Sequence, residues 1–469
     1  MPRRRSKRPR PKCFNLMQNP SFEVGFASWE KSGDIMIESG AYEGVHVVQM
    51  GEGPASLWQD VSLAGVAPLP LLLSFNLFGS LLEISPNTTV EVLWLDARRN
   101  TIGQGRRLFI GEGTLGGSFS TRHTFLAVTE IPPRDAAYAR LLFSKAEGQN
   151  NSLLQIDQVI LTPVRTLNLV QNHSFEADLS YWSADNFSTD YELHLIGAAS
   201  AFSTEGGLLS QDIPLTKQPQ RSPYLLSFAL KCEDNVTVRV TVQWFDSSGS
   251  AIGTPGLDLT IPPNTLGSQN AFLTYLTLTE RAPRGATTAR VTFETSPSES
   301  GLRIDQVIFV RAGTSNLVQN PNFEDGLNGW NEDQVTVLNS PSAYEGNWIA
   351  HFDNEGGALW QEVPLANGDG NCFIFSCALR AGFTDVGTAD TNGLIEVIWL
   401  DRQGREIGLG LNMVLRPTSQ FQIGSVWQVY VGITDKAPSG VAAARIRITK
   451  PSVSNGSLDV DNIILSRLL

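Results

Sequence analysis

The segment Asn15–Glu23 reads NLMQNPSFE, and the pattern returns as NLVQNHSFE at Asn168–Glu176 and as NLVQNPNFE at Asn316–Glu324. Each copy opens a unit that closes on a second shared motif, which reads IDQVI at Ile156–Ile160 and Ile304–Ile308 and VDNII at Val460–Ile464. Successive copies start about 150 residues apart, which is far longer than a solenoid repeat and is the length of a whole domain. The chain of 469 residues is therefore predicted to hold three copies of one module.

The repeats set the expected domain boundaries. We expect a basic, disordered arm at residues 1–13, followed by module 1 at 14–163, module 2 at 167–311 and module 3 at 315–469. The linkers Pro163–Thr166 and Arg311–Ser315 are short and are not rich in Ser and Gly. Their composition predicts a semi-rigid string of three beads.

The inner part of each repeat predicts β-structure. VEVLWLDARRNTIG from Val90, VTVQWFDSSGSAIG from Val240 and IEVIWLDRQGREIG from Ile395 alternate apolar and polar residues and then enter a polar turn. β-Branched and aromatic residues dominate, and no long window has a helical period. The prediction is an all-β protein of three tandem jelly-roll β-sandwich modules, each with roughly eight to ten short strands.

Composition and charge narrow the classes of protein. The four cysteines, Cys13, Cys232, Cys372 and Cys377, do not recur between modules and indicate neither a disulfide framework nor a zinc site. The net charge of the chain is −12, and the first twelve residues carry seven basic side chains. The modules alone therefore have a net charge of −19. Acidic modules argue against nucleic acid as the main ligand. The arm is either a solubilising tail or a docking segment for nucleic acid, an anionic polymer or an acidic partner.

No targeting segment is evident. The basic arm is not followed by an apolar signal-peptide core, and the longest apolar run, Leu69–Phe78, contains Pro, Ser and Asn. That run aligns with shorter apolar segments of the other modules, which makes it a core strand rather than a membrane span. We expect a soluble protein without a transmembrane segment and leave its localisation open.

Several of these motifs carry a resemblance to a known family. The NLxxNxxFE opening, a Trp seven residues after its Phe, the AYEG segment and the IDxVxL closing strand resemble carbohydrate-binding modules of the family 4/9 type, which are galactose-binding-like jelly rolls. The resemblance covers almost the whole chain beyond residue 13. It implies a non-catalytic sugar-binding fold but not a particular sugar. Multi-module proteins of this look also occur in spore-forming bacteria, some of them on the spore surface.

One pair of carboxylates recurs in every module, a Glu in the opening motif and an Asp in the closing strand: Glu23 with Asp157, Glu176 with Asp305, and Glu324 with Asp461. Facing carboxylates suit Ca²⁺, and the resemblance implies a structural calcium held by these residues with backbone oxygens near Ala41–Gly44 and Ala343–Gly346. Module 2, aligned at Ala199–Phe202, lacks the EG pair, so its metal site is the weakest. The alternative is that the carboxylates bind backbone amides without a metal.

Catalysis is not predicted. Glycoside hydrolysis also uses two carboxylates, but three near-identical pairs in opening and closing strands suit a repeated structural role better. No His recurs at a matched position, and no hydrolase, metalloprotease or phosphate-loop motif is present. We assign no catalytic residues and expect no enzymatic activity.

Sugar binding would depend on exposed aromatic rings. The Trp residues that recur in all three modules (Trp29, Trp182, Trp330, Trp94, Trp244 and Trp399) are expected in the core. Trp58 and Trp360 differ, because module 2 has Ser210 at that position, and they are our candidate sugar contacts. The other candidates are Tyr42, Tyr344 and Trp348, which would complete an aromatic platform, and Gln59 and Gln361, which either contact the ligand or cap a strand edge.

Two functions remain open from sequence. The first is a non-catalytic array that binds carbohydrate or a glycan-bearing surface weakly at each module. Its overall affinity would rise by about 10²–10⁴-fold when several sites bind together. The second is a structural coat or spore-surface protein whose modules contact copies of itself or other coat proteins. The lack of an export signal favours the second.

Overall fold

The structure is a computed structural model that describes residues 14–79, 84–116, 121–148, 152–267, 269, 271–366, 368–382, 391–415, 426–452 and 456–469. The arm at residues 1–13, with Cys13, lies outside the described residues. Six antiparallel sheets of five strands each form three sandwiches, and every sheet draws its strands from a single repeat. The predicted all-β, β-sandwich fold class is confirmed.

Module 1 pairs an outer and an inner sheet. Its outer sheet runs in the order β1 (Glu30–Ser32), β4 (Ala55–Ser62), β9 (Tyr138–Lys145), β6 (Thr88–Leu95) and β7 (Thr101–Ile110). Its inner sheet runs β2 (Ile35–Ser39), β3 (His46–Met50), β10 (Leu154–Pro163), β5 (Leu71–Gly79) and β8 (His123–Val128).

Modules 2 and 3 repeat this topology. In module 2 the outer sheet is β11 (Ser183–Asp185), β14 (Gly207–Pro214), β19 (Thr288–Thr295), β16 (Val238–Phe245) and β17 (Leu257–Ile261), and the inner sheet is β12 (Ser188–Asp190), β13 (Ser200–Ser203), β20 (Leu302–Arg311), β15 (Tyr224–Lys231) and β18 (Leu273–Leu278). In module 3 the outer sheet is β21 (Asn331–Asp333), β24 (Gly357–Pro364), β29 (Ala443–Lys450), β26 (Gly393–Leu400) and β27 (Glu406–Leu415). Its inner sheet is β22 (Val335–Asn339), β23 (Trp348–Phe352), β30 (Ser457–Ser466), β25 (Ile374–Gly382) and β28 (Gln428–Ile433). A four-residue helix, α1 (Asn264–Gly267), follows β17.

The recurring tryptophans anchor the sandwiches, as predicted. Trp94 and its counterparts are buried, and each indole lies against a glycine in the next strand or directly before it, so that a side chain at Gly105 would overlap the Trp94 ring. Trp29 is also buried, and its Nε1–H donates to the Asn19 carbonyl at 3.1 Å. The same bond recurs from Trp182 and Trp330.

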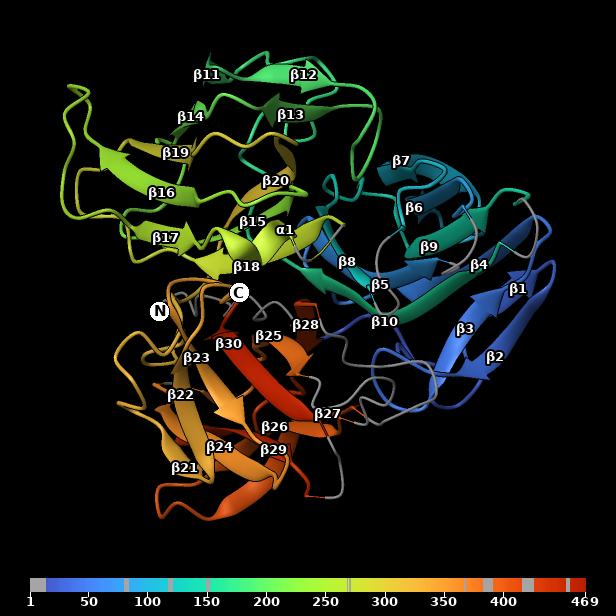
Figure 1. The fold of residues 1–469 in the computed structure, drawn as a ribbon. Coiled ribbons are helices and arrows are strands. Elements are labelled where there is room, and N and C mark those ends of the chain that lie inside the picture. The colour runs from blue at the N-terminus through green and yellow to red at the C-terminus, as the bar shows by residue number, and fades with distance from the viewer. Residues whose placement is uncertain are drawn as a thin grey trace, which may run out of the picture.

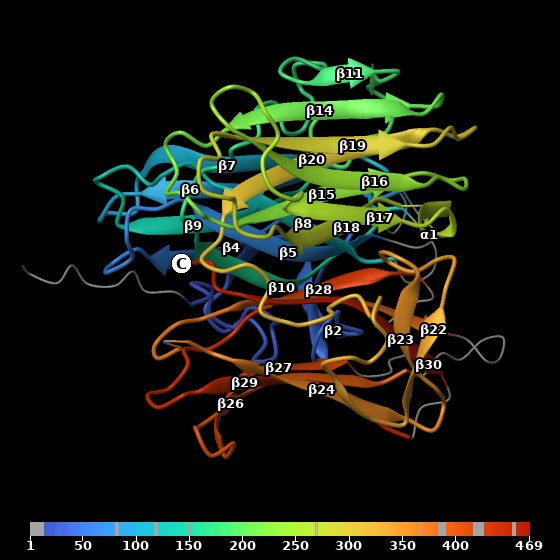
Figure 2. The ribbon, with the colours of Figure 1, turned by 90° about the vertical axis from the view of Figure 1, so that its left-hand side faces the viewer.

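The three modules close into a ring instead of forming a string of beads. Figure 1 shows β8, β18 and β28 meeting at the centre, with the outer sheets on the far side of each module, and Figure 2 shows the same packing from the side. All six residues of β8 and of β18 are buried. One face of each inner sheet fills its own sandwich, and the other joins a shared apolar cluster that includes Leu126, Leu276 and Val429. The expectation of semi-rigid beads is wrong, because the inner sheets are buried on both faces.

Two further findings concern helices and thiols. Within the described residues, no helix has the length and apolar character needed to cross a bilayer. Cys232, Cys372 and Cys377 are buried and unbridged, and burial raises the pKa of the Cys377 thiol above its usual range.

Candidate functional site

The closing-strand aspartates hold a loop that we call the latch loop, residues 41–44 in module 1, 194–197 in module 2 and 343–346 in module 3. Asp157 Oδ2 accepts the N–H groups of Tyr42 (2.8 Å) and Glu43 (3.1 Å). Equivalent bonds run to Asp305 Oδ2 from Leu195 and Ile196, and to Asp461 Oδ2 from Glu345. The latch loop of module 2 is therefore His194–Gly197, and the alignment of Ala199–Phe202 with AYEG was wrong.

The opening-motif glutamates hold the other side of each latch loop. Glu23 Oε1 accepts the N–H groups of Val45 and His46, both at 2.8 Å. Glu176 accepts from Ala198, and Glu324 accepts from Asn347 and Trp348. Each loop ends on a glycine with positive φ, and a side chain at Gly44 would overlap the Glu23 carboxylate. Glycine is required here for both reasons.

Each latch loop also joins its module to the next one around the ring. The N–H groups of Gly44, Gly197 and Gly346 donate, each at 2.7 Å, to the carbonyls of Val414, Phe109 and Thr260 in a neighbouring module. Three such bonds, from module 1 to 3, 2 to 1 and 3 to 2, close the ring with threefold pseudosymmetry. A backbone amide and a carbonyl can form this bond whatever their side chains, so it survives the sequence differences between modules.

The third residue of each closing motif makes a second contact between modules. A bulge after the aspartate gives Gln158, Gln306 and Asn462 positive φ. Their amides donate to carbonyls of the neighbouring central strand: Gln158 to Val431 at 3.3 Å, Asn462 to Leu276 at 3.0 Å, and Gln306 to Leu126. Sequence reasoning missed this role, although the shared Gln or Asn in the motif was a visible signal.

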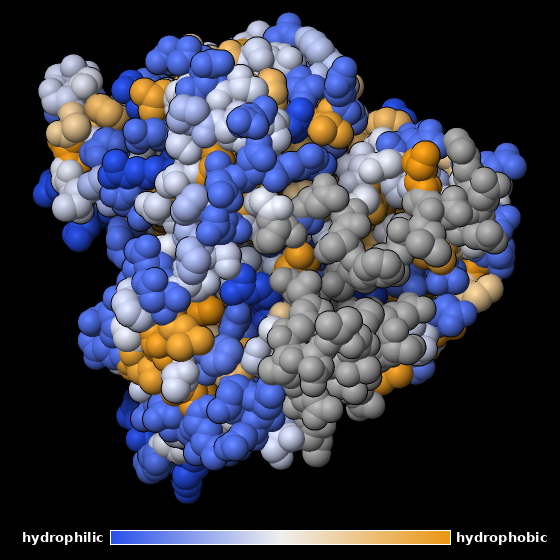
Figure 3. Space-filling model, viewed as in Figure 1, coloured by the Kyte–Doolittle hydropathy of each residue, from blue (hydrophilic) through white to orange (hydrophobic). Residues whose placement is uncertain are grey.

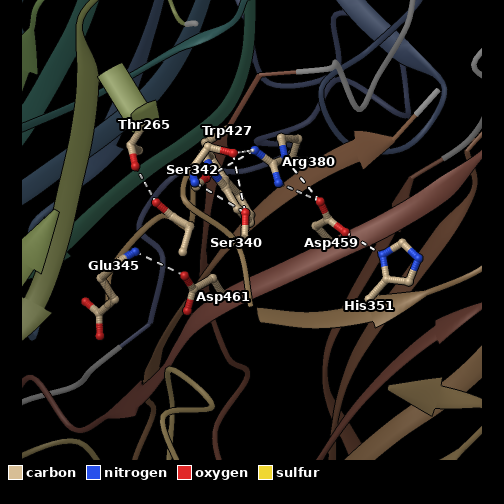
Figure 4. A network of polar contacts seen from close by, with 10 residues as sticks. Thr265, Ser340, Ser342, Glu345, His351, Arg380, Trp427, Asp459 and Asp461 are labelled. Carbon is tan, nitrogen blue, oxygen red and sulfur yellow. Dashed lines mark hydrogen bonds and ion pairs between the residues drawn. The ribbon is translucent and has the colours of Figure 1, made fainter. Parts of the chain in front are cut away.

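Figure 4 shows how the latch loop of module 3 is held. Arg380 on β25 pairs with Asp459 at 2.8 Å and donates to the Ser342 hydroxyl at 2.8 Å, while Trp427 Nε1–H donates to the Ser342 carbonyl at 2.7 Å. From module 2, the Thr265 hydroxyl donates to the Ala343 carbonyl at 2.6 Å. His351 contacts Asp459 on the side away from the loop, so this network does not form a Ser–His–Asp catalytic arrangement.

The surroundings of the latch carboxylates disfavour their charged forms. Burial raises the pKa values of Asp157, Asp305 and Asp461 well above the usual range. In modules 1 and 3 a third carboxyl lies in the latch loop itself, and burial with nearby Glu23 or Glu324 raises the pKa of Glu43 and of Glu345 to about 7. Module 2 has Ile196 at this position and so has no second buried carboxyl beside Asp305.

These contacts bear on the calcium expected at Glu23, Asp157, Glu176, Asp305, Glu324 and Asp461. The described residues contain no group of three or more His, Cys, Asp or Glu side chains placed to hold a metal ion. Glu345 Oε2 is buried without a hydrogen-bond partner, but the paired Glu and Asp oxygens face N–H groups, which a cation would repel. The observed contacts are those of the alternative drawn from sequence, in which amides bind the carboxylates, and calcium stays a prediction.

Trp58 and Trp360 lie on the outer faces of modules 1 and 3. Buried and half-buried residues alternate along β4, so that Leu57 and Gln59 point into the sandwich and Trp58 points away from it. Trp360 has the same setting on β24, and Ser210 occupies the position on β14 of module 2.

A cross-strand ion pair borders each of these positions, with an N–O distance of 2.6 Å in every module: Asp60–Arg140, Asp212–Arg290 and Glu362–Arg445. The Trp58 Nε1–H has no acceptor among the described residues. The outer faces of modules 1 and 3 thus combine an indole with charged hydrogen-bonding groups, and that of module 2 has the charged groups alone.

The rest of the proposed aromatic platform is not assembled. Tyr42 and Tyr344 are buried between modules, where each stacks on a tyrosine of the neighbour with ring centroids 4.3 and 4.4 Å apart. Their placement beside Trp58 and Trp360 was wrong, because the latch loop turns toward the next module. Trp348 is 38% exposed but begins β23, in the inner sheet. It lies next to β22, which carries exposed Leu338, in the part of module 3 where Figure 3 shows apolar surface.

Gln59 and Gln361 bind the backbone of the opening motif and not a strand edge. The side chain of Gln59 accepts from the Gln18 N–H at 2.8 Å and donates to the Gln18 carbonyl at 2.9 Å. Gln361 and Gln211 make the same pair of bonds with the opening motifs of modules 3 and 2. Both polar ends of these buried amides are used inside the module, so their role as ligand contacts is not supported.

No protein-family model and no curated protein matches the chain. Solved structures similar to parts of it include the N-terminal CBM22-1–CBM22-2 tandem domain of Paenibacillus barcinonensis Xyn10C, 14% identical over 64% of this chain and 97% of that one, with a TM-score of 0.25. The C-terminal family 22 carbohydrate-binding module of Clostridium thermocellum Xyn10B is 19% identical over 32% of this chain and 99% of that one, with a TM-score of 0.25.

A further match is the enzymatically active domain of tailspike protein 4 of bacteriophage CBA120, 16% identical over 32% of this chain, with a TM-score of 0.26. This chain spans only 21% of the tailspike chain. The modules matched belong to family 22, and others belong to families 61 and 16. The resemblance to the family 4/9 type in particular is not confirmed.

Proposed function

We propose that the protein is a non-catalytic carbohydrate-binding protein and that the outer faces of modules 1 and 3 hold the sugar. The observation that supports this most directly is an indole directed to the solvent side of a sheet, at a position where module 2 keeps the same sandwich with Ser210. The ring is therefore not needed to build the module. An indole can stack on the apolar face of a sugar ring, and the neighbouring charged groups can bind its hydroxyls.

The double variant Trp58→Ala/Trp360→Ala tests the proposal. Because each ring supplies the stacking surface of its face, we expect retention of the protein on its cognate glycan, in an array or in affinity electrophoresis, to fall by at least about tenfold. The melting temperature should stay nearly unchanged, since both side chains point out of the core. Trp348→Ala, which removes an exposed indole from the other sheet, is the matched control and should retain binding.

Three results would count against the proposal. Loss of folding in the double variant would assign the rings to the core, and unchanged glycan retention would remove them from the site. Absence of any sugar signal, together with growth in size on sizing chromatography at rising concentration, would favour the coat-protein alternative. Such assembly would need surfaces other than the latches, which are already used within one chain.

The calcium prediction has its own measurement. Bound calcium would stabilise the folded state, so chelation by EGTA should lower the calorimetric melting temperature. Glu43→Ile/Glu345→Ile gives modules 1 and 3 the residue of module 2, Ile196, and should reduce that dependence. A melting temperature that is the same with and without EGTA would mean that the amide contacts alone hold the latches.

A further inference from the structure

The cleft between modules 1 and 2 differs from its two counterparts in the ring. At three equivalent positions it carries Arg106, Phe109 and His173. The cleft between modules 2 and 3 carries Leu257, Thr260 and Pro321 there, and the cleft between modules 3 and 1 carries Leu411, Val414 and Pro20. The equivalence is fixed by the glycine before Arg106, which packs on a core Trp in all three modules, and by the Phe109 carbonyl, which accepts the latch bond. The other two clefts also hold open space, about 620 Å³ between modules 2 and 3 and about 350 Å³ between modules 3 and 1, but no Lys or Arg of the described residues lines it.

These residues line open space. A cavity of about 360 Å³ is bordered by Arg106, Phe109, His173 and Glu176, and Phe109 also borders a second hollow of about 580 Å³. Phe109 borders both and is 40% exposed, and Thr260 is exposed at the equivalent position of module 2. Both oxygens of Glu176 are close to the Ala198 N–H, so this carboxylate is bound to the latch loop.

Arg106 brings a buried positive charge to this cavity, and Glu130 is the nearby acidic group that acts on it. Its Nη2–H donates to His173 Nε2 at 2.8 Å, and burial together with Arg106 lowers the pKa of His173 to about 3, so the imidazole is a neutral acceptor. Arg106 Nε is buried and has no acceptor among the described residues. Burial lowers the Arg106 pKa from its usual value, yet a guanidinium stays charged in proteins. A charge in this setting favours an anionic partner.

We propose that this cleft binds an acidic sugar, with the carboxylate of the sugar on Arg106 and its ring against Phe109. A guanidinium and a carboxylate match in geometry and form charge-assisted hydrogen bonds, and an exposed phenyl ring offers an apolar surface to a pyranose. The choice of a sugar rests on the proposed function, but Arg106 and Phe109 lie on the edge strand β7, three strands away from the β4 strand that carries Trp58.

The test is calorimetric titration of the full chain with D-glucuronate, with D-glucose as the neutral analogue and inorganic phosphate as a bare oxyanion. We expect glucuronate to bind at least about tenfold more tightly than either. Arg106→Leu should abolish that binding and remain folded, because Leu257 and Leu411 occupy the position in the other modules. Arg98→Leu, which removes the same charge from an exposed turn, should bind as the parent does. Phe109→Thr, copying Thr260, should weaken glucuronate and leave phosphate unaffected.

The outcomes separate this site from the outer faces. Glucuronate binding that persists in Trp58→Ala/Trp360→Ala and disappears in Arg106→Leu supports the cleft, whether or not the outer faces bind glycan. No glucuronate binding by the parent chain, or undiminished binding by Arg106→Leu, would overturn the proposal. Equal binding of phosphate and glucuronate, with no effect of Phe109→Thr, would overturn its sugar part.

Discussion

Replacing Tyr344 by alanine is expected to lower the free energy of unfolding by about 3–5 kcal/mol, as for other buried aromatic side chains. The ring is 1% exposed, stacks on Tyr275 of module 2 and donates its hydroxyl to the Thr274 carbonyl at 2.8 Å. The variant loses both contacts and leaves a cavity between modules 2 and 3. Urea denaturation followed by tryptophan fluorescence measures the change, since Trp427 lies against the same ring.

Tyr344→Leu is the matched control, because module 2 has Leu195 at this position of its latch loop. Leucine keeps most of the apolar volume and loses one hydrogen bond, so we expect a cost of about 1–2 kcal/mol. A cost below about 1 kcal/mol for Tyr344→Ala would mean that the latch does not couple the modules.

Stability should fall between about pH 4.5 and pH 7 through Glu43 and Glu345. The folded protein raises the pKa of each carboxyl from an ordinary value of 4.5 to about 7. Below the lower value both states are protonated and no stability is lost. As the pH rises, the unfolded chain ionises first, and the folded state loses up to about 3 kcal/mol for each group by pH 7.

Glu43→Gln/Glu345→Gln should remove this dependence. We expect the difference in unfolding free energy between this variant and the parent, measured by urea titration in EGTA, to grow steadily from pH 4.5 to pH 7. Comparing the two proteins cancels the opposite contribution of His123 and His173, whose lowered pKa values destabilise the fold as the pH falls below 6.5. A difference that does not vary with pH would show that these carboxyls ionise normally.

The sequence allowed the modules to be predicted but not their packing. Apolar and polar residues alternate along β6, and a Trp recurs at the position of Trp94 in all three modules. Both features reflect the core of a single sandwich, and the predicted β-sandwich was confirmed. The ring had a signal too, since LLLSF in β5 and the whole of β8 lack alternation and are buried on both faces. That signal shows that a second face is covered, but not by which surface, because any apolar partner would satisfy it.

The site was predicted in part for a related physical reason. Trp58 was singled out because module 2 replaces it by Ser210, and divergence at an outward position does point to the surface. Tyr42 was chosen because its loop was expected beside Trp58, and this failed because the loop turns toward module 3. The latch loop of module 2 was misplaced since HLIG shares only its glycine with AYEG, and the backbone bonds that define the loop do not depend on the other side chains.

The closed ring changes what multiple sites can achieve. Because the inner sheets meet at the centre, the outer sheets with Trp58 and Trp360 look away from one another (Figure 1). A rigid body with diverging sites cannot lay both along one straight polymer, so the gain from linked engagement is lost there. It can instead bind two separate polymer chains at once. If both faces bind glycan, one molecule of this protein would act as a cross-linker that sets the spacing between polymers.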